Sequence, residues 1–440
     1  MSNMFLNAAR SLITPYLNIF KDSLWTLFLK IISVAVKFYL ISVITRRYGS
    51  DDYGAYVLAM SIFLLANSFI RLGFDVYIQQ FTKQLLEKYS GNYIRGKFVS
   101  VAIIPFFLGL IISGIFVLIA SQFDFTKTLR LTYLYELSFY TCIYSLFWLT
   151  TYFFRGYDKG KTSVLILEVI QPITNIILIY VFSWFFINAS TLKILVHSFG
   201  ISIIFSLLIY FFSDKLALIK ATIKFKIKDI DINRDLTNSK DFLLVSISAM
   251  ILAWTDTYVI ALFESDSNIA LYQVALKFSL FTLFPVSAMS IYFMNKMIQL
   301  RQSKNDKEIN HLLHSLTRVL VYTTTFIVVL IMVFSREILL FFGEEFLEAR
   351  TSLFVLCLAY GVAAILGLYE TVILVSEKKA YLAKLFVYMA ILNICLNIPL
   401  THFLSIEGTA VGTLLTVVFG KVMQVRIVQK QLINESAKRV

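Results

Sequence analysis

The chain has 440 residues, of which 58% are hydrophobic and only 15% are charged. Soluble domains carry about 25% charged residues, so this composition excludes a soluble globular protein and indicates a polytopic membrane protein. The formal net charge of +13 would favour a nucleic-acid-binding protein if the chain were soluble. In a membrane protein the positive-inside rule explains such an excess, and we expect no nucleic acid partner.

The three cysteines, Cys142, Cys357 and Cys395, lie in apolar segments and form no CxxC pair. This pattern is typical of small apolar side chains, and it predicts neither a disulfide framework nor a metal site. No nucleotide, metal or nucleophile motif stands out in the sequence. We therefore expect no catalytic residues and no cofactor.

Twelve apolar runs are long enough to cross a bilayer as helices, for which about 20 residues suffice. Because polar backbone groups cannot be left unsatisfied in lipid, we expect twelve transmembrane helices and an all-α polytopic fold. The approximate ranges of the runs are 23–45, 54–75, 99–120, 131–154, 163–186, 194–212, 241–263, 270–295, 316–336, 348–374, 381–402 and 408–426.

The basic residues orient these helices. Most of the 40 lysines and arginines fall in segments that lie inside if the N-terminus is inside, so both termini are predicted to be cytoplasmic. The longest inner loop separates six helices from six, which indicates a parallel repeat about a pseudo-two-fold axis. We expect an N-lobe at 1–214, a basic cytoplasmic linker at 215–240, and a C-lobe with a cytoplasmic tail at 241–440.

The seventh run carries a single charge, Asp256, in the stretch from 242 to 263. A charged side chain at the centre of a membrane helix costs roughly 2.5–3.5 kcal/mol on insertion scales, so this residue indicates a function and a partner. One predicted partner is Lys277, which follows the next outer turn at a similar depth and could form a structural ion pair.

The other predicted partners come from the last two helices. Asn393 and Asn397 are spaced i, i+4, as are Thr409 and Thr413, and both pairs lie near the depth of Asp256. One carboxylate with amide and hydroxyl oxygens is a plausible shell for a hard cation. For the threonines, packing of the small-residue face GTAVGT is the alternative.

Two further sets of polar residues lie at membrane depth. Basic side chains there could meet an anionic substrate group as point charges, although the first of them could simply extend to the inner interface. They are Lys30, Lys37 and Lys277. On the fifth run, three polar residues repeat at helical spacing and could line a cavity for sugar hydroxyls. They are Glu168, Gln171 and Asn175.

Several segments carry a family resemblance. They are VITRRYGSDDYGAYVLAMSIFLLANSFIRLGFD near the N-terminus, and ILLFFGEEFLEARTSLFVLCLAYG, VSEKKAYL and ILNICLNIPLTHFLSIEGTAVGTLLT in the C-terminal half. With six-plus-six helices, the chain resembles the polysaccharide-transporter branch of the MOP superfamily. It is most similar to O-antigen (Wzx-type) lipid-linked oligosaccharide flippases, with lipid II flippases and multidrug MATE antiporters as relatives.

The resemblance implies two six-helix lobes in a V around a cavity that opens alternately to each side of the bacterial cytoplasmic membrane. It implies an undecaprenyl-diphosphate-linked oligosaccharide as substrate, which the lysines would meet through the diphosphate. Asp256 with polar residues on helices 11 and 12 resembles the sodium site of lipid II flippases. Asn397 replaces a second carboxylate there, so the coupling cation is left open as H⁺ or Na⁺.

The expected partners are this substrate, membrane lipids, a polysaccharide polymerase and other assembly proteins, and we expect a monomer. A cation-coupled MATE-like drug exporter is the alternative, but a basic cavity favours an anionic substrate. A membrane-bound glycan polymerase or ligase would need a sizeable outer loop with catalytic residues. The predicted outer loops are short, so we expect a transporter and not an enzyme.

Overall fold

The computed structural model describes residues 2–86, 89, 91–122, 129–157, 159–186, 190–213, 232–302, 306–374, 376 and 379–437. Within these residues the chain is helical and contains no strand. The all-α prediction is therefore confirmed. Much of the expected basic linker lies outside the described residues, because the description resumes only at residue 232.

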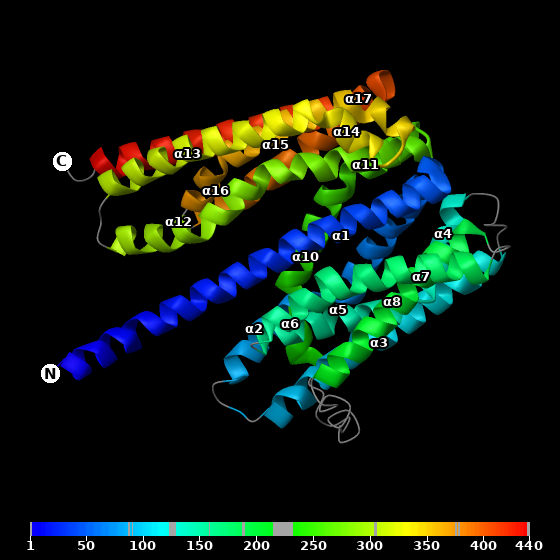
Figure 1. Cartoon of the computed structure of the whole chain (residues 1–440), viewed down its shortest axis with the longest axis horizontal. Helices are drawn as coiled ribbons and strands as arrows, with labels where there is room; N and C mark the ends of the chain where they lie inside the picture. The colour runs from blue at the N-terminus through cyan, green and yellow to red at the C-terminus, as the bar shows by residue number, and fades with distance from the viewer. Residues whose placement is uncertain are drawn as a thin grey trace. The chain divides into compact units, whose positions relative to one another are not determined.

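The helices of the N-terminal half follow one another with short connections (Figure 1). They are α1 (Ser2–Ile70), α2 (Phe74–Leu86), α3 (Gly91–Gln122), α4 (Leu129–Ser138), α5 (Thr141–Gly156), α6 (Gly160–Leu165), the π-helix η2 (Ile166–Ile170), α7 (Gln171–Phe185) and α8 (Thr191–Ser213).

The C-terminal half contains α10 (Ile232–Phe263), α11 (Asp266–Ser279), the 3-10 turn η4 (Leu280–Leu283), α12 (Phe284–Gln302), α13 (Asp306–Val333), α14 (Ser335–Leu340), the 3-10 turn η5 (Glu344–Ala349), α15 (Arg350–Ile365), α16 (Gly367–Leu374) and α17 (Lys379–Ala437).

Two of these helices each contain two expected spans and turn sharply between them. In α1 the turn is at Gly49, whose φ of 87° is open to glycine at no steric cost. In α17 it is at Ser405, whose φ of 55° is uncommon for a residue with a side chain. The expected first and second spans, and the eleventh and twelfth, are therefore helical hairpins within single named elements.

Eight helices of the described residues are long and apolar enough to cross a membrane. The two turned helices account for four of the twelve expected spans, and six others contain one span each. The run at 131–154 is divided between α4 and α5, and the run at 241–263 lies in α10. The chain is thus a multi-pass membrane protein whose helices follow the predicted order.

The chain divides into two compact units. Unit 1 comprises Met1–Ile44 and Ala59–Ile251, and unit 2 comprises Thr45–Leu58 and Leu252–Val440. This division differs from a simple cut in the linker. The turn between the first two spans belongs to unit 2, and the first part of α10 belongs to unit 1.

Unit 2 holds its short N-terminal segment by polar contacts. The Thr45 hydroxyl donates to the carbonyl oxygen of Phe342 at 2.8 Å, and the Arg46 guanidinium donates to the carbonyl oxygens of Leu340 and Phe341 at 3.0 and 2.9 Å. A cation at the C-terminal end of a helix, here α14, is favoured by the helix dipole. These contacts explain why the segment groups with unit 2.

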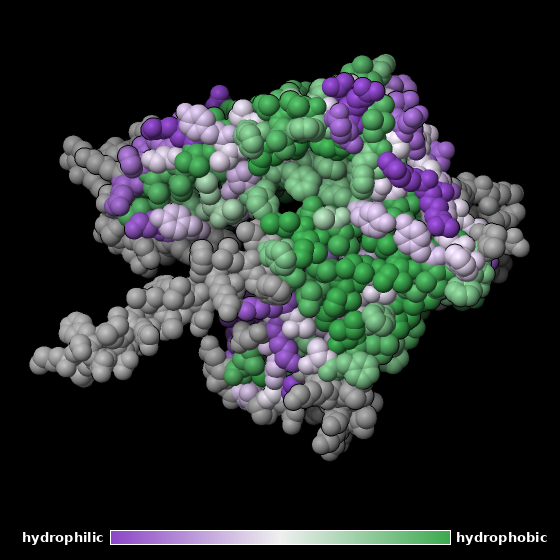
Figure 2. All heavy atoms as spheres, viewed as in Figure 1, coloured by the Kyte–Doolittle hydropathy of each residue, from purple (hydrophilic) through white to green (hydrophobic). Residues whose placement is uncertain are grey.

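Large apolar side chains are exposed on both units, among them Phe326 on α13 of unit 2. In unit 1, large side chains at the end of α7 are strongly exposed, with Trp184 at 79% and Phe185 at 74%. Figure 2 shows hydrophobic residues gathered over α7 and α8. In unit 2, α12, α13, α16 and α17 bury a hydrophobic core that includes Phe293, Met297 and Leu368. An apolar exterior around such a core is what lipid contact requires.

Candidate functional site

Asp256 is the centre of a hydrogen-bonded cluster in unit 2. Its Oδ2 atom accepts from the Tyr272 hydroxyl at 2.6 Å and from the Thr413 hydroxyl at 3.0 Å. Its Oδ1 atom accepts from the Asn397 amide at 2.7 Å. Helices α10, α11 and α17 thus each contribute to the site, and the three donors are all neutral.

Tyr272 occupies the position across the α10–α11 hairpin from Asp256 that was predicted for Lys277. Helix α10 ends at Phe263 and α11 begins at Asp266, so the turn between them is centred one to two residues before the assumed position. That shift of the turn moves the residue opposite Asp256 about three positions earlier in α11. Lys277 lies five residues beyond Tyr272, or about 7.5 Å along the helix axis. The hairpin register therefore favours a hydroxyl donor over the ion pair with Lys277.

The predicted asparagine and threonine pairs separate into two roles. Asn397 and Thr413 donate to the carboxylate, and Asn393 lies beside it and donates to the Thr413 hydroxyl at 3.5 Å. Thr409 shares a 2.7 Å hydrogen bond with Thr401. That contact lies within the small-residue packing face, so Thr409 belongs to the packing alternative.

The side-chain oxygen of Asn397 is buried and has no hydrogen-bond partner among the described residues. Gly412 borders it so closely that an added Cβ would lie 2.0 Å from this oxygen. Buried acceptors without a partner are rare and costly. The carboxylate of Asp256, the hydroxyl of Thr413 and this oxygen are ligands of the type that hard cations prefer.

In unit 1, Lys37 forms an ion pair with Glu168, and the Ser33 hydroxyl donates to the same carboxylate oxygen at 3.0 Å. The side chain of Lys37 is 48% exposed. Lys30 is also exposed on the same helix. Charged groups at membrane depth almost always face water or the protein interior, so these lysines indicate an aqueous surface on α1.

A π-helix presents Glu168. Pro172 has no N–H group to donate to the carbonyl of Glu168 four residues earlier, and the Gln171 N–H instead bonds to the carbonyl of Ile166. Single π-turns of this kind are frequent at functional sites. The local sequence therefore explains why Glu168 departs from the α-helical register of its neighbours.

The other two polar residues of this run lie elsewhere. The Gln171 amide donates to the Ser202 hydroxyl of α8 at 2.9 Å, and Asn175 is buried with an exposed fraction of 3%. Asn175 therefore lies inside unit 1, whereas Gln171, like Glu168, is only half-buried. The structure removes Asn175 from the accessible surface that the spacing of the three residues had suggested.

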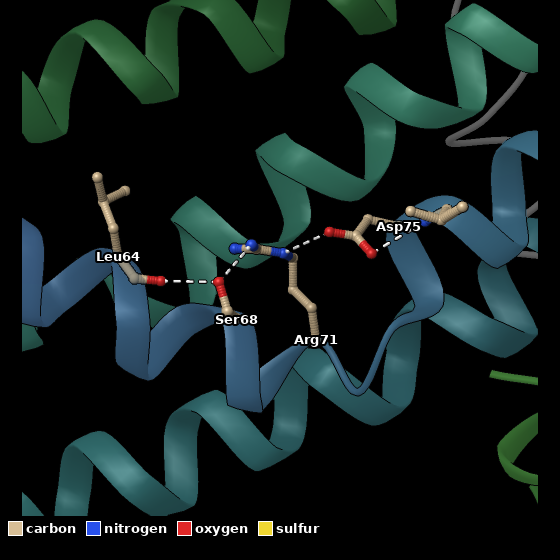
Figure 3. A network of polar contacts seen from close by, with 5 residues as sticks. Leu64, Ser68, Arg71 and Asp75 are labelled. Carbon is tan, nitrogen blue, oxygen red and sulfur yellow. Dashed lines mark hydrogen bonds and ion pairs between the residues drawn. The ribbon is translucent and has the colours of Figure 1, made fainter. Parts of the chain in front are cut away.

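A buried ion pair in unit 1 had no role in the sequence interpretation. The Arg71 guanidinium donates to Asp75 at 3.2 Å and to the Ser68 hydroxyl at 3.1 Å, and Ser68 in turn donates to the carbonyl of Leu64 (Figure 3). The pair encloses the turn between α1 and α2, where Leu72 and Gly73 have positive φ. The sequence signal for this ion pair was the arginine and the aspartate that flank the glycine in RLGFD.

This turn packs tightly against α10. A Cβ on Gly73 would lie 2.4 Å from the backbone nitrogen of Leu243 and 2.5 Å from the carbonyl oxygen of Ser239. Only glycine permits that backbone approach. The Arg71–Asp75 pair therefore positions the surface on which the first part of α10 rests.

A comparison with known proteins identifies the family of this chain. A family model described as polysaccharide biosynthesis protein matches residues 19–292, which is more than half of the chain. The chain belongs to this family. No curated protein sequence is significantly similar to it.

Several solved structures share the fold of this chain at low sequence identity. One is the lipid II flippase MurJ in an inward closed conformation, with a TM-score of 0.69, 18% identity, and coverage of 94% of this chain and 89% of MurJ. Another is an inward-facing MATE multidrug resistance transporter of the MOP superfamily, with a TM-score of 0.68, 13% identity, and coverage of 93% and 100%. A Vibrio cholerae MATE transporter gives 0.63 at 15% identity, with coverage of 94% and 97%.

The solved structures confirm the predicted fold, and the family match confirms the predicted relation to polysaccharide biosynthesis.

Proposed function

We propose that the protein is a flippase for undecaprenyl-diphosphate-linked oligosaccharide, such as an O-antigen or similar repeat unit. It moves this lipid from the cytoplasmic to the outer leaflet of the bacterial cytoplasmic membrane by alternating access. The observation that carries the proposal is the match to the polysaccharide biosynthesis family over residues 19–292. The fold shared with a lipid II flippase supports the same substrate class.

The proposal gives the lysines of unit 1 a chemical role. A diphosphate needs cationic partners in a wet path, while the lipid tail can stay in the bilayer. Lys37 is half-exposed and already paired with Glu168, so a diphosphate would compete with that carboxylate for the ammonium group. Lysine suits this exchange because it meets phosphate as a point charge without a fixed fork geometry. Lys30 would extend the same basic surface towards the inner leaflet, and Lys277 is a separate candidate for the diphosphate on unit 2.

The cluster at Asp256 would couple transport to H⁺ or Na⁺. In the described contacts the carboxylate is held by Tyr272, Asn397 and Thr413, none of which neutralises its charge. A bound cation would neutralise it and would satisfy the unpaired oxygen of Asn397. A ligand shifts a conformational equilibrium only through differential affinity, so the two states of the transporter must differ in this cluster.

The direct test reconstitutes the purified protein in liposomes with a fluorescent undecaprenyl-diphosphate oligosaccharide. Flipping is followed as protection of the fluorophore from an impermeant quencher. We expect flipping to depend on a Na⁺ or pH gradient, and Lys37→Ala to reduce it at least tenfold while Lys193→Ala, at an exposed lysine of α8, leaves it unchanged. Wild-type protein that flips no lipid under either gradient would refute the proposal.

The second candidate is a cation-coupled multidrug exporter. The fold shared with MATE transporters, with coverage of 93% of this chain, is the observation in its favour. The two exposed lysines of α1 argue against it, because Glu168 offsets only one of their charges and a basic surface repels the many exported drugs that are cationic. Ethidium efflux from cells expressing the protein separates the two, since a lipid flippase should give no efflux above the background.

We also propose a monomer with both termini in the cytoplasm, working beside a polysaccharide polymerase and other assembly proteins. The basic inner segments support this orientation. Reporter fusions at the two termini test it, because an enzyme that is active only outside the cytoplasm should remain inactive at both positions.

A further inference from the structure

A second charged cluster lies in unit 2, away from Asp256. The Lys421 ammonium on α17 donates to Glu370 Oε2 on α16 at 3.0 Å and to the side-chain oxygen of Gln424 at 2.9 Å. The Gln424 amide approaches the same Glu370 oxygen at 3.5 Å. The three side chains therefore close a ring in which the lysine and the amide both point to one carboxylate oxygen.

The two charged side chains differ in their exposure. The Lys421 side chain is only 9% exposed, whereas the Glu370 side chain is 33% exposed. No described residue donates to the other carboxylate oxygen of Glu370. A carboxylate at membrane depth faces water or protein in preference to lipid, so the exposed part of Glu370 indicates an aqueous surface of unit 2.

Lys421 is buried, and an ion pair with a buried member is weak evidence for stability, because the desolvation of its charge can exceed the attraction to its partner. An apolar pair of similar volume would hold α16 against α17 at less cost. The retained charges therefore call for a use beyond packing, and the open oxygen of Glu370 offers one.

The charges on this cluster select the kind of ligand. The ammonium of Lys421 is bonded to one oxygen of the carboxylate and disfavours a cation there, while the carboxylate disfavours a phosphate. A neutral hydroxyl donor meets neither repulsion and gains a hydrogen bond to an ionised acceptor, which is stronger than a neutral one. Gln424 holds the carboxylate in place with its amide.

The same construction recurs in unit 1. There one oxygen of Glu168 accepts from both Lys37 and Ser33, and the Glu168 side chain is 27% exposed. Each unit therefore has a part-exposed glutamate with a lysine and a neutral donor on one oxygen. The lysines differ, because Lys37 is 48% exposed and can meet a phosphate, whereas Lys421 is 9% exposed and leaves only the carboxylate of its pair open to a ligand.

We propose that Glu370, held by Lys421 and Gln424, is a binding site for sugar hydroxyls of the transported glycan. The proposal rests on the flippase function proposed above. It assigns glycan recognition in unit 2 to a neutral ion pair, separate from the diphosphate-binding lysines and from the cation cluster at Asp256.

The test measures the affinity of full-length protein in nanodiscs for two probes. One is undecaprenyl diphosphate, which has no sugar, and the other is lipid-linked oligosaccharide extracted from the cells that make the protein. Wild-type protein should bind the oligosaccharide form more tightly. Glu370→Ala should weaken that binding about tenfold or more, the value of a hydrogen bond to a charged group, and leave the affinity for undecaprenyl diphosphate unchanged.

A double variant, Glu370→Met with Lys421→Met, guards against misfolding because it leaves no uncompensated charge. It should lose the same preference for the sugar-bearing probe. Leu374→Ala, at an exposed apolar position of α16, should behave as the wild type.

Four results overturn the proposal. Equal weakening of both probes would make the cluster structural, and a double variant with wild-type preference would remove it from glycan binding. Wild-type protein that binds neither probe would overturn the flippase function together with this site. Wild-type protein that binds both probes equally would overturn the glycan site alone.

Discussion

Gly412→Ala tests the geometry of the Asp256 cluster most directly. The added Cβ would lie 2.0 Å from the Asn397 side-chain oxygen, 3.1 Å from its Cγ and 3.4 Å from its backbone nitrogen. Contacts under 3.0 Å do not persist, so the amide must move. The oxygen that fits a cation would then leave the site, and its amide could no longer donate to Asp256 in the present geometry.

The expected change in cation affinity follows from the loss of the Asn397 contact. A hydrogen bond or ligand contact to a charged group contributes about 1.5–3 kcal/mol. Since each 1.4 kcal/mol corresponds to a factor of ten, the half-saturating concentration of the coupling cation should rise about 10- to 100-fold. The assay is lipid flipping in liposomes as a function of NaCl at fixed pH, and of pH at fixed NaCl.

Gly420→Ala is the matched control on the same helix. A Cβ there would also be close to a neighbour, at 2.3 Å from the sulfur of Met389, but a thioether side chain can move aside at little cost. We expect unchanged cation dependence for this variant. An unaltered half-saturation for Gly412→Ala, or an equal change in the control, would refute the assignment of Asn397 to the cation shell.

Three further predictions follow from the described contacts. Tyr272→Phe removes a donor that stabilises the empty, charged carboxylate, so the half-saturating cation concentration should fall about tenfold, and a rise would show that the hydroxyl itself is a ligand. Because Tyr272 occupies the position opposite Asp256, Lys277→Ala should not restore transport to an Asp256→Ala variant, whereas rescue in the double variant would reinstate the ion pair. Asp75→Asn leaves Arg71 buried without its counter-charge and should destabilise the protein by about 3–5 kcal/mol, seen as a lower melting temperature in detergent, and a melting temperature equal to the wild type would contradict the structural role.

Charge and spacing located the centre of the candidate site. A lone aspartate in an apolar run is conspicuous, and the i, i+4 repeats of asparagine and threonine are visible in the sequence of the last two helices. Their approach to Asp256 follows from depth alone, because each lies a similar number of residues from an outer turn. Asn397 and Thr413 therefore reach the carboxylate as the spacing suggested.

Other features depend on boundaries that sequence does not give to single-residue accuracy. The donor opposite Asp256 changed from Lys277 to Tyr272 because the turn between α10 and α11 is centred one to two residues earlier than assumed. The π-turn before Pro172 rotates Glu168 away from the register of Gln171 and Asn175. Thr409 is a third case that the sequence could not decide. Its hydroxyl forms a hydrogen bond with the nearby hydroxyl of Thr401 and so needs no contact with Asp256.

The division of the chain into two units determines how the protein would behave if it were expressed as two fragments. The first half of the chain supplies Thr45–Leu58 to unit 2, and the second half supplies the opening part of α10 to unit 1. The two halves therefore exchange segments, much as two protomers do in a domain-swapped dimer. A chain broken between α8 and α10 would yield fragments that each lack a piece held by the other, and coexpressed fragments should purify as one inseparable pair.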